Sequence, residues 1–217
     1  MTDYAKRRTM MVDTQVRPSD VTKFPIIDAM LDTPRELFVP DALREAAYVG
    51  ENLDIGGGRT LLEPRTFAKM VDALMIDPAD VVLDIGCGLG YSTAIAAQLS
   101  EFAVGVEDDA DRASDAQALL SRIGIDNAAI VSGSLAEGAA KSGPYDIIMI
   151  QGAIEAFPKA LEDQLKDGGR VAALFADGAL GVVRIGHKRD GQITWRDAFN
   201  ANAPILADFL REDTFAL

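Results

Sequence analysis

Two acidic residues and three glycines form the part of the sequence with the clearest chemical meaning. Asp84 interrupts an apolar run that leads into Gly86, Gly88 and Gly90 at alternate positions. A buried strand followed by a glycine turn and a helix lets the backbone approach a ligand, and the first amides of the helix point at it. Glu107 ends the next apolar run, about 20 residues later. The pattern predicts a nucleotide-like ligand between two carboxylates.

The spacing favours one kind of ligand. A dinucleotide-binding turn has the pattern G-x-G-x-x-G and binds a pyrophosphate, whereas here the third glycine comes one residue early and Asp84 would repel phosphate. The same carboxylate suits a ligand with an ammonium and a sulfonium group, and Glu107 can accept hydrogen bonds from both ribose hydroxyls. We therefore expect S-adenosylmethionine as the cofactor. The alternative is an ordinary βαβ turn, in which such glycines also occur.

Alternating strands and helices would position these residues. The sequence predicts strands over 81–85, 102–107, 128–132, 145–150 and 170–175, and helices over 66–74, 91–99, 109–123 and 158–165. Repeated β-then-α units indicate a parallel sheet with helices on both faces. Past Gly178, two strand-like runs flank Asp190-Gly191, which is a hairpin signal. We therefore expect an α/β fold whose sheet ends in an antiparallel pair.

The N-terminal part has a different character. Residues 25–31 and 34–40 are typical of short helices, so a helical segment should precede the core. Residues 52–64 contain three consecutive glycines and a terminal proline, which favours an irregular loop over the crevice at the strand ends. We predict a single domain over 1–217, with the N-terminal helical segment and acceptor loop at 1–63 and the cofactor-binding core at 64–217.

Composition limits the partners. The net charge of −13 argues against nucleic acid, because phosphate binding needs clustered lysine and arginine. No stretch approaches transmembrane length and residues 1–16 lack the apolar core of a secretory signal, so we expect no membrane partner and a cytoplasmic location. The single cysteine gives neither a disulfide framework nor a metal cluster. The oligomeric state stays open.

The chain as a whole resembles the S-adenosylmethionine-dependent methyltransferases with a Rossmann-like sheet, and more closely the protein-L-isoaspartate O-methyltransferase family. The resemblance rests on residues 11–17, 34–40, the glycine-rich loop and the run Leu-Asp-Ile-Gly-Cys-Gly-Leu-Gly-Tyr at 83–91. It implies a seven-stranded sheet with an antiparallel last pair, and carboxyl methylation of isoaspartyl residues in protein repair. It also implies that Asp84, Gly86 and Gly90 hold the methionyl end and Glu107 the ribose.

Four further residues are expected at the cofactor. Cys87 and Gly88 complete the glycine turn, although a small residue such as Cys87 is also suited to close packing there. The family has an acid beside the adenine, in the sequence Gly-Asp-Gly. Ser134 takes that place here, followed by Leu135, and a serine hydroxyl can still hydrogen-bond the purine.

The acceptor loop departs from the family. Members usually read Gly-x-Gly-x-Thr-Ile-Ser-x-Pro, and this chain reads Gly-Gly-Gly-Arg-Thr-Leu-Leu-Glu-Pro. The family serine, taken to orient the acceptor carboxylate, is Leu62 here, and Glu63 would repel an anionic acceptor if it faced inward. Arg59 or Arg65 can compensate with a guanidinium. Thr60 is the best remaining hydroxyl, unless it is only a turn residue.

The expected reaction explains the lack of an obvious base. A carboxylate acceptor is already ionised near neutral pH, so the enzyme needs only to position and desolvate the reactants. The single histidine, His187, falls in the predicted hairpin, where we expect a packing or surface role. Gln151 follows the fourth strand and joins Thr60 and Leu62 as a candidate acceptor-site residue. Two alternatives remain: a methyltransferase for another carboxylate or small molecule, and a cofactor-binding regulatory protein without turnover.

Overall fold

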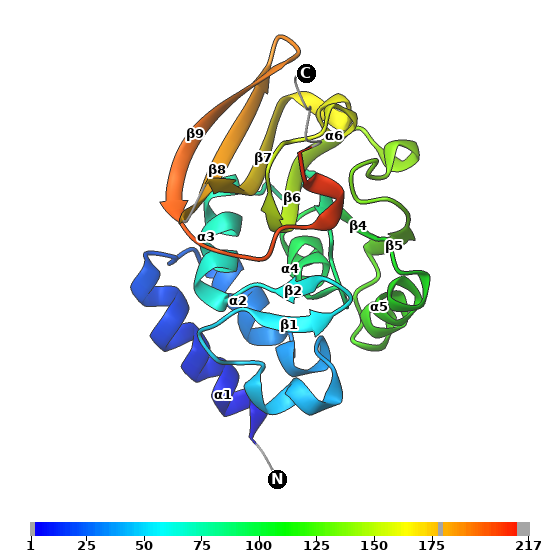
Figure 1. Ribbon diagram of the computed structural model, residues 1–217. Coiled ribbons are helices and arrows are strands. Elements are labelled where there is room, and N and C mark those ends of the chain that lie inside the picture. The colour runs from blue at the N-terminus through cyan, green and yellow to red at the C-terminus, as the bar shows by residue number, and fades with distance from the viewer. Residues whose placement is uncertain (1–2, 178–179, 212–217) are drawn as a thin grey trace.

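The central element is one seven-stranded sheet (Figure 1). The computed structural model describes residues 3–177 and 180–211, so the change of pattern expected at Gly178 and the ends of the expected domain lie outside it. The sheet strands are β3 (Val81–Ile85), β4 (Phe102–Glu107), β5 (Ala128–Ser132), β6 (Tyr145–Ile154), β7 (Leu165–Asp177), β8 (Leu180–Arg189) and β9 (Gln192–Asn200). Their order is β5-β4-β3-β6-β7-β8-β9; the first five are parallel, and β8 and β9 are antiparallel. The predicted fold class is confirmed.

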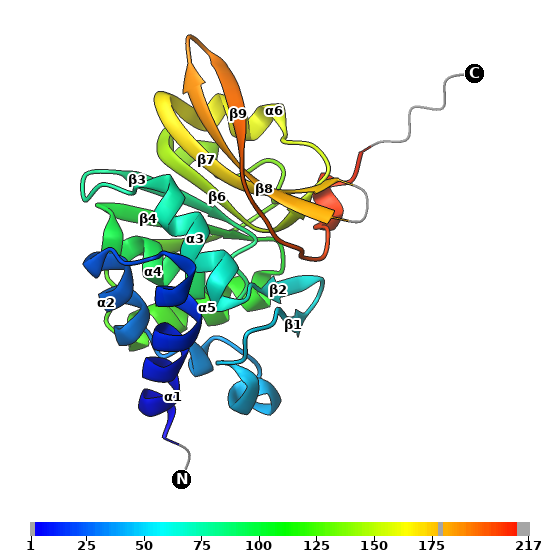
Figure 2. The same cartoon turned by 90° about the vertical axis from the view of Figure 1, so that its left-hand side faces the viewer.

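Both faces of the sheet are covered, but unequally. The helices are α1 (Tyr4–Met11), α2 (Phe24–Asp32), α3 (Pro64–Leu74), α4 (Tyr91–Leu99), α5 (Ala110–Arg122) and α6 (Lys159–Gln164). Successive strand residues point to opposite faces, so Val82 packs with the cluster of α2, α3 and α4, whereas Leu83 packs with Leu161 of α6 and Phe209. Figure 2 shows these helices from the side. Residues of the 133–144 connection and of the C-terminal segment 201–210 complete the second face.

The short elements follow from local signals. Pro64 occupies the first position of α3, where its missing N–H costs nothing. The Asp109 side chain accepts a hydrogen bond from the Arg112 amide and caps α5. The helix expected at 34–40 is only a 3-10 turn, Arg35–Leu37, because the flanking prolines leave too few residues for an α-helix.

The segment expected as an irregular loop is instead a β-hairpin. Strand β1 (Leu53–Gly56) pairs antiparallel with β2 (Arg59–Leu61). The three glycines of its turn have φ values of +86°, +60° and +71°, a region that residues with a side chain avoid. The prediction of an irregular loop was therefore wrong: the glycines turn the chain back on itself and leave strand on both sides.

The β8–β9 hairpin is confirmed. Its turn residues Asp190 and Gly191 have φ values of +53° and +76°, as a two-residue hairpin turn requires. His187 lies within β8. Trp195 of β9 packs between Phe157 and Phe175, with ring centroids 5.4 and 4.9 Å away. No helix among the described residues is long and apolar enough to cross a bilayer.

Candidate functional site

Asp84 is a fully buried carboxylate at the end of β3. Its Oδ2 accepts hydrogen bonds from the hydroxyls of Ser92 and Thr93, both at 2.6 Å, and its Oδ1 accepts one from Gln151 Nε2 at 2.7 Å. Burial raises the pKa of Asp84 to about 6, even though these three bonds act in the opposite direction. All three partners are neutral, so the site keeps an uncompensated negative charge that a cation would stabilise.

The glycine turn follows directly and is tightly covered. Gly86, Gly88 and Gly90 have φ values of +73°, +58° and +92°. A Cβ on Gly88 would lie 2.7 Å from Cδ1 of Ile55, and one on Gly86 would lie 3.5 Å from Cδ1 of Leu206. The cradle that the sequence predicts is therefore formed, and side chains from the β1–β2 hairpin and the C-terminal segment lie against it.

Glu107, at the end of β4, is buried and bonded to two arginines. Nε of Arg59 lies 3.1 Å from both carboxylate oxygens, and Nη1 of Arg112 lies 3.2 Å from Oε1. Nη2 of Arg59 also bonds Asp108, and the backbone N–H of Gly88 donates to Oε2 at 3.0 Å. Burial raises the pKa of Glu107, and the two arginines oppose that rise. The carboxylate expected at the ribose thus already carries cationic partners from this chain.

The residues expected at the adenine meet the C-terminal segment. Oδ2 of Asp208 accepts hydrogen bonds from the backbone N–H of Leu135 at 3.1 Å and from the Ser134 hydroxyl at 3.4 Å. Leu206 anchors the segment: it is 1% exposed, and its N–H donates to the carbonyl of Ala153 at 2.9 Å.

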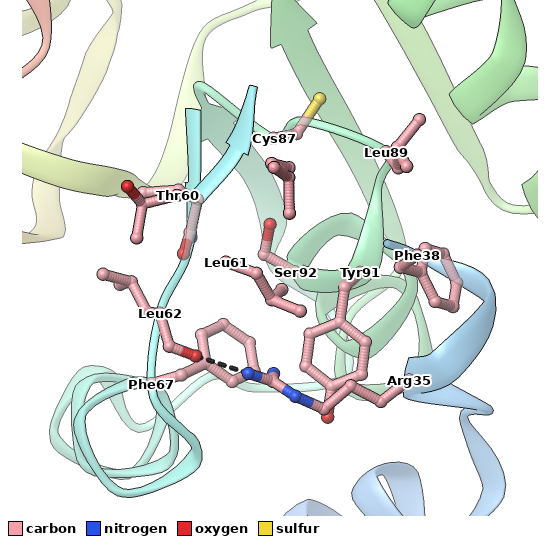
Figure 3. Close-up of a pocket in the computed structure, with 12 residues that line it drawn as sticks. Arg35, Phe38, Thr60, Leu61, Leu62, Phe67, Cys87, Leu89, Tyr91 and Ser92 are labelled. Carbon is pink, nitrogen blue, oxygen red and sulfur yellow. Dashed lines mark hydrogen bonds between the residues drawn. The ribbon is translucent and has the colours of Figure 1, made fainter. Parts of the chain in front are cut away.

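The expected acceptor residues border a small pocket beside Asp84 (Figure 3). Arg35, Phe67 and Tyr91 lie at one end and Cys87 at the other, with Ser92 between them. The enclosed space is about 10 Å³, room for about one water. Burial raises the pKa of the Cys87 thiol, so it stays protonated and unreactive at neutral pH.

Thr60, Leu62 and Gln151 all line this pocket. Gln151 donates to Asp84, which makes it a partner of the carboxylate. Leu62 is 2% exposed, and its carbonyl accepts a hydrogen bond from Nη2 of Arg35 at 2.7 Å. The structure thus brings the three candidates next to Asp84, while Ser134 and Leu135 lie at Asp208.

Neither compensating arginine reaches the acceptor pocket. Arg59 bonds Glu107 and Asp108, as described, and Arg65 lies 3.8 Å from the Glu63 carboxylate. Glu63 in turn accepts a hydrogen bond from the Thr66 hydroxyl at the start of α3.

Sequence reasoning missed several residues of the site. Arg35 is fully buried, its guanidinium lies 4.7 Å from the Tyr91 ring centroid, and within the described residues its Nη1 has no hydrogen-bond partner. The sequence signal for Arg35 was its position in the run 34–40, on which the family resemblance partly rests. Ile55, Leu206 and Asp208 gave none, because apolar and acidic residues in such segments are ordinarily surface or core residues.

The fold and the site define a class: a Rossmann-like sheet with a glycine turn and two carboxylates at adjacent strand ends is the arrangement of an S-adenosylmethionine-dependent methyltransferase. The chain matches the protein-L-isoaspartate(D-aspartate) O-methyltransferase family over residues 6–201. It is 33% identical to a protein-L-isoaspartate O-methyltransferase of Koribacter versatilis over 89% of this chain and 87% of that one. A relative from Syntrophus aciditrophicus is 38% identical over 79% and 78%. The chain belongs to this family.

Solved structures of low sequence identity share the fold. A protein-L-isoaspartate O-methyltransferase superposes with a TM-score of 0.78 and 23% identity, over 93% of this chain and 65% of that one. A Plasmodium falciparum protein of the same description, in complex with S-adenosyl-L-homocysteine, superposes with a TM-score of 0.80 and 20% identity, over 93% and 98%.

The family cofactor is S-adenosylmethionine, and the groups expected to bind it are present in this chain. The glycine turn, Asp84 and Glu107 form the expected donor and acceptor set. Arg59 bonds Glu107, the carboxylate expected at the ribose, and Asp208 accepts hydrogen bonds from the Leu135 amide and from the hydroxyl of Ser134, the residue expected at the adenine. In this conformation, the β1–β2 hairpin and residues 201–210 therefore supply partners for groups that are expected to bind the cofactor.

Proposed function

We propose that this protein is an S-adenosylmethionine-dependent O-methyltransferase that methylates the carboxylate of isoaspartyl residues in peptides or proteins, as a step of protein repair. The observation that supports it is the pair of buried carboxylates, Asp84 and Glu107, at adjacent strand ends around a positive-φ glycine turn. The family match over residues 6–201 and the names of the curated relatives point to the same reaction. A carboxylate acceptor also suits a chain with a single histidine, in β8.

The proposal assigns separate roles to the residues near Asp84. Asp84, Gly86, Cys87, Gly88, Gly90 and Glu107 would contact the cofactor, with Ser134 and Leu135 at its adenine. Thr60 and Leu62 would border the acceptor. Gln151 would act as a positioning residue, because its amide bonds the Asp84 carboxylate.

The proposed setting follows from composition. Protein or peptide carboxylates are the expected partners, and nucleic acid is not, because of the net charge of −13. A cytoplasmic location fits a chain with one cysteine, which is buried.

The side chain of Leu62 favours a related candidate, a methyltransferase for a different carboxylate or a small molecule. The hydroxyl that the family uses at this position is missing, and the leucine is 2% exposed. The side chains that fill the cofactor crevice favour the other candidate, a regulatory protein without turnover. The two properties to test are therefore binding of the cofactor and the identity of the methyl acceptor.

The first experiment measures cofactor binding. Calorimetry with S-adenosylmethionine and S-adenosyl-L-homocysteine should give saturable binding to the wild-type chain and none to Asp84→Ala. The control is Asp126→Ala, which removes an exposed carboxylate just before β5, at the opposite edge of the sheet from the glycine turn. Unchanged affinity in Asp84→Ala would contradict its assignment as an anchor.

The second experiment measures transfer. A labelled methyl group should move to an isoaspartyl peptide and not to the same peptide with a normal aspartyl residue. Leu62→Ser should raise this transfer if the family serine was lost from a retained acceptor site, and Leu43→Ser, at a half-buried leucine outside this pocket, serves as its control. Binding without transfer to the peptide would refute repair, and labelling in a cell extract would then identify another acceptor.

A further inference from the structure

Two segments far apart in the sequence meet over the cofactor crevice. The β1–β2 hairpin and the C-terminal segment both lie at the carboxyl ends of the sheet strands (Figures 1 and 2). Asn52 joins them at the base: its Nδ2 donates to the carbonyl of Asn202 at 2.6 Å, and its Oδ1 accepts from the amide of Glu63 at 2.8 Å. The β1–β2 hairpin and the C-terminal segment are therefore bonded to each other, and both also lie against the glycine turn.

Arg59 is the hairpin residue that bonds the Glu107 carboxylate. Its side chain is 4% exposed, and its Nε donates to both oxygens of Glu107, which is fully buried. Two ribose hydroxyls would approach the same two oxygens. A charged guanidinium makes stronger hydrogen bonds to a carboxylate than neutral hydroxyls do, and Arg59 adds a bond to Asp108. Within this chain, Arg59 is thus a direct competitor for the place of the ribose.

The backbone of the hairpin holds Arg59 in that position. Gly56 pairs with Arg59 across the turn, and a Cβ on Gly57 would lie 2.2 Å from Nη2 of Arg112. The side chain of Ile55 lies against Gly88 on the same side. The turn therefore lies against Arg112 and the glycine turn at 86–90 together, so lifting of the hairpin would take Arg59 off Glu107.

Asp208, in the C-terminal segment, bonds the residues expected at the adenine. Its Oδ2 accepts hydrogen bonds from the backbone N–H of Leu135 and from the hydroxyl of Ser134, which is the group expected to bond the adenine. Leu206 fixes its place against Gly86 and Gly152, since a Cβ on Gly152 would lie 2.7 Å from Cγ of Leu206.

We propose that Arg59 and Asp208 are affinity-determining residues that occupy the ribose and adenine positions of this chain's own cofactor crevice, so that the cofactor binds only by displacing them. This inference rests on the proposed function. The apparent affinity is lowered by the fraction of molecules in which the crevice is open, and a change that weakens the closed form raises the affinity by the same factor.

The test compares ligand affinity in variants of the full chain. S-Adenosyl-L-homocysteine, titrated calorimetrically, should bind Arg59→Gln at least about tenfold more tightly than wild type, and Asp208→Ala by a smaller factor. Glutamine keeps a hydrogen-bond donor for the buried Glu107, whereas alanine would remove both hydrogen bonds from Arg59 and could prevent folding. Arg65→Gln, which removes a guanidinium from a half-exposed ion pair nearby, is the matched control and should leave the affinity unchanged.

A second readout needs no ligand. Hydrogen exchange at the amides of β1 and β2 and at Gly88 should be faster in Arg59→Gln than in wild type or Arg65→Gln, because the hairpin opens more often. Equal affinity of wild type and Arg59→Gln, weaker binding by the variant, or unchanged exchange would each overturn the inference. Absence of binding by wild type and by every variant would refute the proposed function itself, and with it the competition.

Discussion

At the scale of single residues, Asp84 shows a conflict between stability and function. The carboxylate is fully buried, and its pKa of about 6 means that folding disfavours its charge. Ser92, Thr93 and Gln151 satisfy its hydrogen bonds but bring no positive charge. Buried groups with perturbed pKa values gather at functional sites. At Asp84, a cationic ligand would offset the free-energy cost of the buried charge.

The first prediction concerns the pH dependence of this strain. Because the folded state holds the Asp84 proton more tightly than the unfolded chain, this residue stabilises the fold most below about pH 4, and that contribution is lost as the pH rises to about 6. Asp84→Asn removes the titration; its amide oxygen still accepts from the hydroxyls of Ser92 and Thr93, and Gln151 can turn its amide. The variant should gain about 3 kcal/mol relative to wild type between those pH values.

Urea unfolding of both proteins at several pH values between about 4 and 8 measures this difference. Glu101→Gln, a change at an exposed residue just before β4, is the control, and its unfolding free energy should follow that of wild type at every pH. A wild-type minus Asp84→Asn difference that does not vary with pH would show that the carboxyl titrates normally in the fold.

At the scale of elements, the two segments over the crevice were the hardest to predict. Strand β1 has four residues and β2 has three, too few for alternation to be recognised, and the glycines between them suggest a loop as readily as a turn. Asp190-Gly191 was predictable because the signal for that turn lies within the turn itself. The C-terminal segment 201–210 has little regular structure, a 3-10 turn at Ala207–Phe209 and a single parallel bridge from Ile205 to Ala153, so its place depends on distant contacts.

The second prediction concerns the anchor of that segment. Leu206 is 1% exposed against Gly86 and Gly152, whereas its neighbour Ile205 is 37% exposed. Leu206→Ala should lower the free energy of unfolding by about 2 to 4 kcal/mol and Ile205→Ala by less than about 1 kcal/mol, since only the first leaves a cavity. Urea unfolding of the pair decides this, with exchange of the Leu206 amide as a local readout. Equal losses would mean that the segment does not pack on the crevice.

At the scale of the whole molecule, local pattern determined the sheet and long-range contacts determined the state of the site. The alternation of strands and helices sufficed to predict the sheet and to place Asp84 and Glu107 at neighbouring strand ends. The partners that occupy the crevice lie far away in the sequence: Arg59 is 48 residues from Glu107, and Asp208 is 73 residues from Leu135. A single sequence holds no local signal for such pairs. It could therefore predict which groups contact the ligand, but not that Arg59 and Asp208 bond the same groups.

The net charge of −13 should bias the choice of acceptor. A negative field attracts cationic peptides and repels anionic ones over about 10 Å at 0.1 M salt and about 30 Å at 0.01 M. For two isoaspartyl peptides that differ only in their flanking residues, the lysine-flanked one should have the higher kcat/KM at low salt, by about tenfold. Raising the salt to about 0.3 M should bring the two values together, because screening acts on the field and not on contacts in the pocket. A preference that survives high salt would instead place the discriminating charges inside the acceptor site, where bulk salt screens them much less.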